Sequence, residues 1–192
     1  WHLGFDDREA WPLQQGFDTF FGFLNQFFLQ RPAENPQPGR PGYRDPYLQT
    51  DNGERRRHPG HLSWTLLESA RSRIHAGAAQ SAPWFLAFWP YAPHEPLQPP
   101  PDLARDFDAS PRGRHSALLA TLDRQVAGLV SALEESGQRG STLIVFASDN
   151  GGTGRYAPSN APLAGSKGFF YEGGVRVPLW INGPQTRQGR WD

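Results

Sequence analysis

The chain contains 192 residues, which is enough for one domain with a sizeable hydrophobic core. Its 19 basic and 19 acidic residues give a formal net charge of zero, which argues against nucleic acid or an anionic membrane surface as the main partner. Cysteine is absent, which excludes disulfides and thiolate chemistry, and no apolar run approaches the ~18 residues of a membrane span.

The N-terminal third of the chain predicts little regular secondary structure. Residues 16–23 are rich in Phe and Gly and predict a short strand or turn that packs Phe side chains into the core. Residues 31–61 contain repeated prolines, which exclude a regular helix, and predict a long loop. The basic cluster Arg55-Arg56-Arg57 lies in this loop, as a solvated stretch or as a substrate-facing one that attracts anionic groups.

The next segments predict a helix and a buried strand. Apolar residues at helical spacing between Leu62 and Ile74 predict a helix over residues 61–75. Residues 83–90, with the sequence PWFLAFWP, predict a strand framed by prolines. His94 follows just past this strand, where ligands bind in open α/β sheets, and is therefore a candidate site residue. The alternative is an ordinary loop histidine.

The second half of the chain predicts helix and strand in alternation. Residues 115–136 carry a continuous apolar stripe and predict a helix, with Gly137 at the position of a helix C-terminal glycine. Residues 142–147 are apolar without alternation and predict a strand buried on both faces, as in a parallel sheet. Residues 175–181 predict a further strand. The fold class expected is therefore α/β, a mostly parallel sheet flanked by helices with right-handed crossovers.

Two hard oxygen donors follow the strand over residues 142–147. Asp149 offers a carboxylate and Asn150 an amide oxygen, on a turn that Gly151 and Gly152 continue. Such donors suit Ca²⁺ or Mg²⁺. The alternative is a plain turn, because Asp, Asn and Gly are the commonest turn residues.

Lys167 is the only lysine among the 19 basic residues of the chain. Lysine is a compact, mobile point charge that can reach an anion and transfer a proton, which arginine does poorly. The flanking glycines, Gly165 and Gly168, let the backbone approach a ligand closely. Lys167 is thus a candidate for anion binding. The alternative is that a single lysine remains by chance in an arginine-rich sequence and has no special role.

Six segments, in order along the chain, resemble the sulfatase family within the alkaline-phosphatase-like superfamily. They are WHLG at Trp1, GFDTFFGF at Gly16, APHEPLQPP at Ala92, LLATLDRQVAGLVSALEESG at Leu118, TLIVFASDNGG at Thr142 and NAPLAGSKGFFYEGGVRVP at Asn160. No single segment is decisive, but the ordered set is specific and spans nearly the whole chain.

The resemblance implies hydrolysis of a sulfate ester, with a formylglycine made from a Cys or Ser of the enzyme. The metal ion that the resemblance implies is Ca²⁺ in preference to Mg²⁺. By motif, Asp149 and Asn150 correspond to metal ligands. His94 corresponds to the histidine that binds the sulfate and the leaving oxygen, and Lys167 to the lysine that contacts the sulfate and assists leaving-group departure. His2 corresponds to the histidine of a GKWHLG-like motif that helps to release sulfate.

The family's nucleophile motif is not found in this sequence, which has no Cys and no S-x-P/A-x-R segment. In the family this motif and the paired metal-binding aspartates precede WHLG. We therefore expect residues 1–192 to be a single partial catalytic domain, without the N-terminal nucleophile and metal segment and without the C-terminal subdomain. We expect this fragment alone to be inactive and to bind Ca²⁺ weakly. Family members are commonly periplasmic, secreted or lysosomal.

Two other functions fit part of the pattern. One is a phosphodiesterase or phosphonate monoester hydrolase of the same superfamily, which would use a similar metal site. The other is a non-catalytic module that binds sulfated glycans. For the sulfatase, the expected partner is a sulfated small molecule or glycan, and the loops over residues 24–61 and 98–113 are the expected specificity segments.

Overall fold

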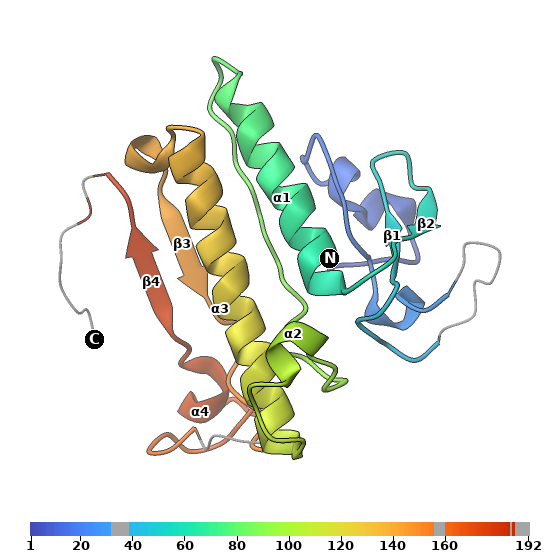
Figure 1. The fold of residues 1–192 in the computed structure, drawn as a ribbon, viewed down its shortest axis with the longest axis vertical. Coiled ribbons are helices and arrows are strands. Elements are labelled where there is room, and N and C mark those ends of the chain that lie inside the picture. The colour runs from blue at the N-terminus through green and yellow to red at the C-terminus, as the bar shows by residue number, and fades with distance from the viewer. Residues whose placement is uncertain (32–38, 156–159, 185, 187–192) are drawn as a thin grey trace. The chain divides into compact units, whose positions relative to one another are not determined.

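The computed structural model describes residues 1–31, 39–155, 160–184 and 186 (Figure 1). The chain divides into two compact units, Trp1–Leu129 and Val130–Asp192. Each unit contains one small sheet, β1-β2 in the first and β3-β4 in the second. Among the described residues, none of the helices has both the length and the apolar character that crossing a bilayer requires.

The first unit contains most of the helical residues. Its elements are the 3-10 helices η1 (Arg8–Ala10), η2 (Pro12–Gln14) and η3 (Gln26–Phe28), the strands β1 (Tyr47–Gln49) and β2 (Arg55–Arg57), and the helices α1 (Leu62–Ala78), α2 (Pro101–Ala104) and α3 (Pro111–Glu135), the last of which continues into the second unit. The second unit adds η4 (Arg139–Ser141), β3 (Ile144–Ala147), α4 (Glu172–Val175) and β4 (Leu179–Asn182).

The core of the first unit is built on one face of α1. Leu62, Leu66, Ala70 and Ile74 of this helix are buried, as their spacing predicts. Leu62 and Leu66 join a cluster that includes Tyr43, Leu48, Tyr91 and Leu118. Each fully buried leucine contributes about 1.5–3 kcal/mol. The helix expected over residues 61–75 is confirmed, and it continues for three further residues to Ala78.

Local hydrogen bonds explain both ends of α3. The helix begins at Pro111 rather than at the expected His115, because proline suits the first helical turn and the hydroxyl of Ser110 accepts from the amide of Gly113 at 3.0 Å. It ends as predicted, since Gly137 has a left-handed φ of 72° and its amide donates to the Glu134 carbonyl at 3.0 Å.

Two predictions for the first unit are wrong. Residues 83–90 form no strand, and the side chains of Phe85 and Trp89 are 79% and 52% exposed. Conversely, the segment expected to be irregular contains the antiparallel hairpin β1-β2, in which Tyr47 pairs with Arg57. Gly53, with φ of 81°, allows the tight turn that joins the two strands.

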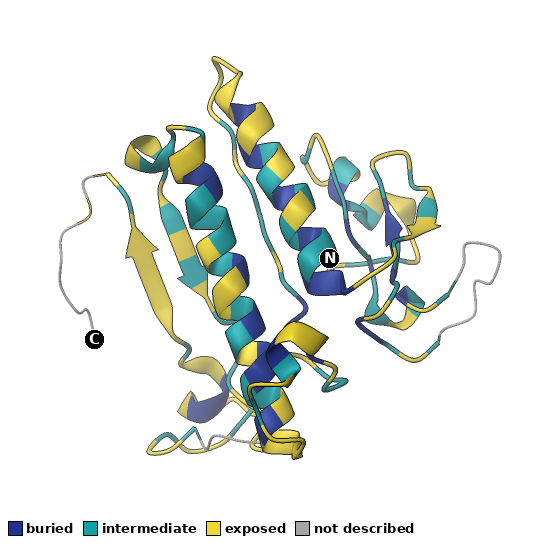
Figure 2. Ribbon diagram, in the orientation of Figure 1, coloured by how far each residue is buried: buried dark blue, intermediate teal, exposed yellow. Residues whose placement is uncertain are grey.

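The second unit also differs from its prediction. The apolar run before Asp149 forms a four-residue strand, β3, that is antiparallel to β4. Its residues alternate between half-buried and exposed, and β4 is exposed at every position (Figure 2). The mostly parallel sheet with strands buried on both faces is therefore not present in the described residues, whose two sheets are both antiparallel.

The third expected strand begins later than its apolar residues indicate. Residues 172–175 turn into the short helix α4 instead, with the Arg176 amide donating to the Glu172 carbonyl at 2.8 Å. The side chains of Glu172 and Arg176, four positions apart, form an ion pair at 3.6 Å. The extended segment is thus confined to β4.

Candidate functional site

The turn after β3 presents two oxygen donors. The carboxylate of Asp149 is exposed and makes no hydrogen bond or ion pair with any other described residue. The amide nitrogen of Asn150 donates to the Gly151 carbonyl at 3.0 Å, and the Ser148 hydroxyl donates to the Asn150 carbonyl at 2.8 Å. The side-chain oxygens of Asp149 and Asn150 are therefore free to accept a ligand.

Close contact between glycines fixes this turn against α4. The Gly151 amide donates to the Gly174 carbonyl at 2.9 Å. A Cβ atom on Gly151 would lie 1.8 Å from the Gly173 carbonyl oxygen, and one on Gly173 would lie 2.4 Å from the Gly165 oxygen. A side chain at either position would push these backbone segments apart, so the glycines are required by packing.

Asn160 ties the Lys167 loop to the same turn. Its side-chain oxygen accepts from the Gly152 amide at 3.0 Å, and its side-chain nitrogen donates to the carbonyls of Gly152 and Gly165 at 2.9 and 3.1 Å. The Lys167 amide also donates to the Gly152 carbonyl at 3.1 Å. The second unit thus brings three of the predicted residues, Asp149, Asn150 and Lys167, into one cluster of loops.

The ammonium group of Lys167 is exposed and forms no ion pair within the described part of the chain. An aromatic segment follows it directly. Gly168, Phe169, Phe170 and Tyr171 line a hollow of about 370 Å³. An anionic group with an apolar body attached could therefore meet a positive charge and an apolar wall from adjacent residues.

His94 lies in the first unit and contacts two tyrosines, Tyr91 and Tyr43. Its ring stacks on Tyr91 at 5.1 Å between centroids, and its carbonyl accepts from the buried Tyr43 hydroxyl at 2.8 Å. Burial raises the pKa values of Tyr43 and Tyr91, so both hydroxyls stay protonated. The His94 Nδ1 lies 2.8 Å from the Glu95 carbonyl, which can only accept, so Nδ1 carries a proton and Nε2 is left for other partners.

His2 has a backbone conformation that is uncommon for its residue type. Its φ of 63° is left-handed, and its amide donates to the Leu24 carbonyl at 3.1 Å. The adjacent Trp1 ring stacks on Trp89 at 5.4 Å. Left-handed non-glycine residues are frequent at functional sites, where the surrounding structure holds them in place.

The described residues fit Ca²⁺ in the kind of donor but not in number. Asp149 and Asn150 supply hard oxygen donors, of which Ca²⁺ takes about six to eight. No group of three or more His, Asp or Glu side chains within the described ranges is arranged to hold a metal ion. A complete metal site therefore needs ligands in addition to these two residues.

The predicted residues fall into two sets. His2 and His94 belong to the first unit, and Asp149, Asn150 and Lys167 to the second. Their convergence on one cleft remains a prediction. Two residues that the sequence did not single out, Tyr43 and Asn160, position His94 and the Lys167 loop respectively. The quoted segment beginning at Asn160 contained one of them, but nothing in its pattern marked the asparagine as a backbone clamp.

Comparison with known proteins identifies the family. The sequence profile described as "Sulfatase" matches residues 1–190, so the chain belongs to the sulfatase family. Arylsulfatase J of Mus musculus is 34% identical over 190 residues, which cover 96% of this chain and 31% of that protein. N-acetylgalactosamine-6-sulfatase of Mus musculus is 31% identical over 189 residues, which cover 93% of this chain and 35% of that protein.

A solved structure supports the same assignment. The crystal structure of Ps i-CgsB in complex with k-i-k-neocarrahexaose has a TM-score of 0.83 and 28% sequence identity, and the match covers 96% of this chain and 43% of that chain. The described residues therefore share the fold of the corresponding part of that protein. The chain spans about a third of the length of the curated relatives it matches, 31% and 35% for the two named above.

Proposed function

We propose that the chain is part of a sulfuric ester hydrolase that cleaves ROSO₃⁻ to ROH and sulfate, with Ca²⁺ and a formylglycine nucleophile. Membership of the sulfatase family supports the reaction class. The single observation that supports the residue assignment is the hydrogen bond from the Lys167 amide to the Gly152 carbonyl at 3.1 Å. It holds the only lysine of the chain beside the turn that carries the candidate metal ligands.

Lys167 is proposed to contact the sulfate and to protonate the leaving oxygen. The leaving oxygen gains negative charge in the transition state, and a fixed ammonium group stabilises that charge. A positioned proton donor contributes about 10²–10⁴-fold in rate. Asp149 and Asn150 are proposed to hold the metal ion, whose positive charge would stabilise the sulfate oxygens when bound.

His94 and His2 are proposed to act from the first unit. The Glu95 carbonyl occupies Nδ1 of His94, which leaves Nε2 to donate a hydrogen bond to the sulfate or to the leaving oxygen. His2 is proposed to accept a proton as sulfate is released. Its left-handed backbone, held by the hydrogen bond from its amide to the Leu24 carbonyl, supports a positioned role for its exposed side chain.

The substrate class proposed is a sulfated small molecule or glycan. The relatives carry the names arylsulfatase and N-acetylgalactosamine-6-sulfatase, and the solved structure named above holds a neocarrahexaose. The aromatic hollow beside Lys167 supports the binding of an organic body next to the sulfate.

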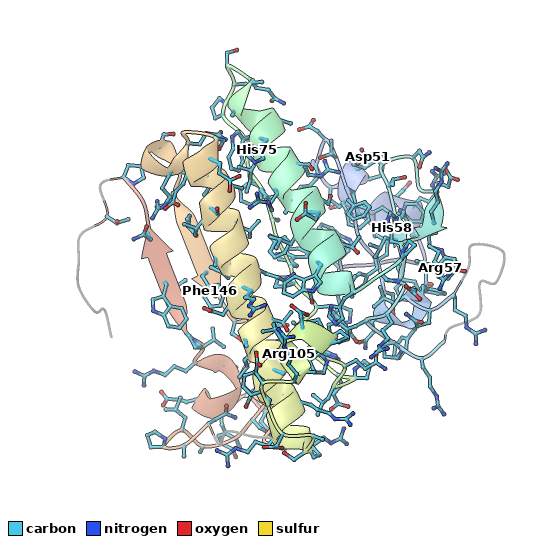
Figure 3. All side chains as sticks on the ribbon, viewed as in Figure 1. Asp51, Arg57, His58, His75, Arg105 and Phe146 are labelled. Atoms are coloured by element: carbon cyan, nitrogen blue, oxygen red, sulfur yellow. The ribbon has the colours of Figure 1, made fainter. Side chains whose placement is uncertain are left out.

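The test uses the protein encoded by the whole reading frame that contains these residues, isolated with Ca²⁺. Sulfate release from an aryl sulfate is measured against phosphate release from the matched aryl phosphate. The proposal predicts faster sulfate release, lost in Lys167→Ala and kept in Arg105→Ala, whose arginine lies beside α2 (Figure 3). Faster phosphate release would favour the related phosphoesterases, and turnover of neither ester would favour a sulfated-glycan-binding module.

A further inference from the structure

The first unit contains a cavity of about 740 Å³ that is lined in part by the residues following His94 in the sequence. Its lining residues are Gln30, Arg31, Arg40, Pro41, Gly42, Arg44, Glu95, Pro96 and Gln98. Ligand-binding pockets commonly have volumes of about 300–1,000 Å³. The cavity is therefore large enough for a sugar ring with its substituents, and two of its lining residues, Glu95 and Pro96, follow His94 directly.

The cavity is strongly cationic. Three arginines, Arg31, Arg40 and Arg44, face a single carboxylate among the lining residues, that of Glu95. None of the three guanidinium groups forms an ion pair or hydrogen bond within the residues that the structure describes.

The arginines of β2 provide a contrast. Arg56 pairs with Glu54 at 2.8 Å and Arg57 with Asp45 at 2.7 Å, and Arg57, labelled in Figure 3, is the last residue of the strand. The basic cluster that the sequence singled out is therefore largely neutralised by neighbouring carboxylates. Unlike Arg56 and Arg57, the three arginines of the cavity form no ion pair within the described part of the chain.

Hydrogen bonds connect the cavity wall to His94. The Gln30 side-chain nitrogen donates to the Arg44 carbonyl at 2.8 Å, and the Gln98 side-chain oxygen accepts from the Tyr43 amide at 3.0 Å. Tyr43, fully buried, donates through its hydroxyl to the His94 carbonyl at 2.8 Å. The backbone that carries Arg44 is thus held in a fixed relation to the backbone that carries His94.

We propose that this cavity binds a second sulfate group of the substrate, so that the enzyme prefers multiply sulfated oligosaccharides to monosulfated small molecules. Guanidinium groups bind sulfate-like oxygens through paired hydrogen bonds in a fixed fork geometry. The inference rests on the proposed function, since it assigns His94 to the sulfate that is cleaved.

The first experiment measures binding to the whole encoded protein by calorimetric titration. The probes are sucrose octasulfate, unsulfated sucrose and inorganic sulfate. The triple variant Arg31→Gln, Arg40→Gln, Arg44→Gln removes the three cavity charges. The control triple Arg105→Gln, Arg112→Gln, Arg124→Gln removes the same net charge from α2, α3 and their connection, where Arg105 and Arg124 lie next to acidic residues. Melting temperatures establish that both variants fold.

We expect the cavity variant to bind sucrose octasulfate at least ~10-fold more weakly than the unmodified protein, and the control variant to change its affinity by less than ~2-fold. Binding of the unmodified protein should weaken as salt rises. Equal losses in both triple variants would mean that only the net charge matters, and no loss in the cavity variant would mean that the anion binds elsewhere. Either result overturns the inference.

The second experiment compares turnover of a disulfated and a monosulfated oligosaccharide of the same backbone with that of an aryl sulfate. The inference predicts that the cavity variant loses most of the preference for the disulfated compound and keeps its turnover of the aryl sulfate. An unchanged preference overturns it. If the unmodified protein binds sucrose octasulfate through the arginines but hydrolyses no sulfate ester, the cavity stands and the proposed function fails.

Discussion

The main-chain amide of Lys167 donates a hydrogen bond to the carbonyl oxygen of Gly152, with 3.1 Å between nitrogen and oxygen. Gly152 and Lys167 are 15 positions apart in the sequence, yet this contact holds the lysine loop on the turn that carries Asp149 and Asn150. The side chain of Asn160 reinforces it from the same loop. The position of the candidate acid relative to the candidate metal ligands is therefore set by backbone contacts rather than by the lysine side chain.

Substituting Asn160 tests this clamp. Asn160→Ala removes hydrogen bonds to both backbone groups of Gly152 and to Gly165. At about 0.5–1.5 kcal/mol for each bond, and with the site partly exposed, we expect a loss of about 1–2 kcal/mol in the free energy of unfolding. Asn160→Asp keeps the acceptor for the Gly152 amide but turns a carboxylate oxygen toward the Gly152 and Gly165 carbonyl oxygens, so its loss should be at least as large. Urea denaturation measures both, and equal stability of Asn160→Ala and the unmodified chain would contradict the clamp.

The close contact between Gly151 and Gly173 of α4 can be tested by adding a single methyl group. Gly151→Ala places a methyl group on the Gly173 carbonyl oxygen, which cannot move without displacing α4. We expect a loss of at least about 2 kcal/mol in unfolding free energy. The matched control is Gly140→Ala, because a Cβ atom there meets nothing within 4 Å. A control as damaging as Gly151→Ala would show that the close approach is not the cause.

Tyr43 is predicted to position His94 through a single hydroxyl. Tyr43→Phe keeps the buried ring, which stacks with His61 and Tyr91, and removes only the donor to the His94 carbonyl. The expected loss is about 0.5–1.5 kcal/mol in unfolding free energy. Tyr47→Phe serves as a control, since its hydroxyl forms no hydrogen bond within the described residues. Equal effects of the two substitutions would argue against the positioning role.

His61 gives the first unit a dependence on pH. Burial lowers the pKa of His61, which accepts from the Ser63 amide through Nδ1 and donates to the Gln98 carbonyl through Nε2, as a neutral ring. The unfolded chain takes up a proton at this residue near pH 6.5, before the folded chain does. The folded state is therefore destabilised as the pH falls below about 6.5, by at most about 1.4 kcal/mol per pH unit from this residue.

His61→Asn tests the assignment, because asparagine can also cap α1 and does not titrate. We expect denaturation measured between pH 5 and pH 8 to show a shallower pH dependence in this variant. His58 and His115, whose pKa values burial also lowers, will keep part of the slope in both proteins. An unchanged slope would mean that His61 is already charged in the folded state or equally exposed in both states.

The sequence predicted the parts of the fold that depend on local pattern. The apolar spacing from Leu62 to Ile74 and the glycine at position 137 identified α1 and the end of α3, because helix period and helix capping are local properties. Strand pairing is not local. The run that became β3 gave no sign that its partner would be antiparallel, and residues 83–90 had strand composition but no paired neighbour.

The candidate site was predictable in its chemistry but not in its supports. Residue types alone identified Lys167 as the only lysine in the sequence and identified the oxygen donors that follow β3. The clamps at Tyr43 and Asn160, and the cationic cavity that collects Arg31, Arg40 and Arg44, depend on contacts between distant or irregular segments. The sequence left the cluster Arg55–Arg57 as either a solvated or a substrate-facing stretch, because the ion pairs of Arg56 with Glu54 and of Arg57 with Asp45 appear only in the folded hairpin.

The most direct test of the central claim is the rate of sulfate release from an aryl sulfate by the whole encoded protein, with Lys167 intact and replaced by alanine. The proposed role of Lys167 predicts Ca²⁺-dependent release that falls by about 10²–10⁴-fold in Lys167→Ala. The folded state should survive this change, because only the main-chain amide of Lys167 contacts Gly152. Undiminished sulfate release in a folded Lys167→Ala protein would show that Lys167 is not the acid that assists the leaving group.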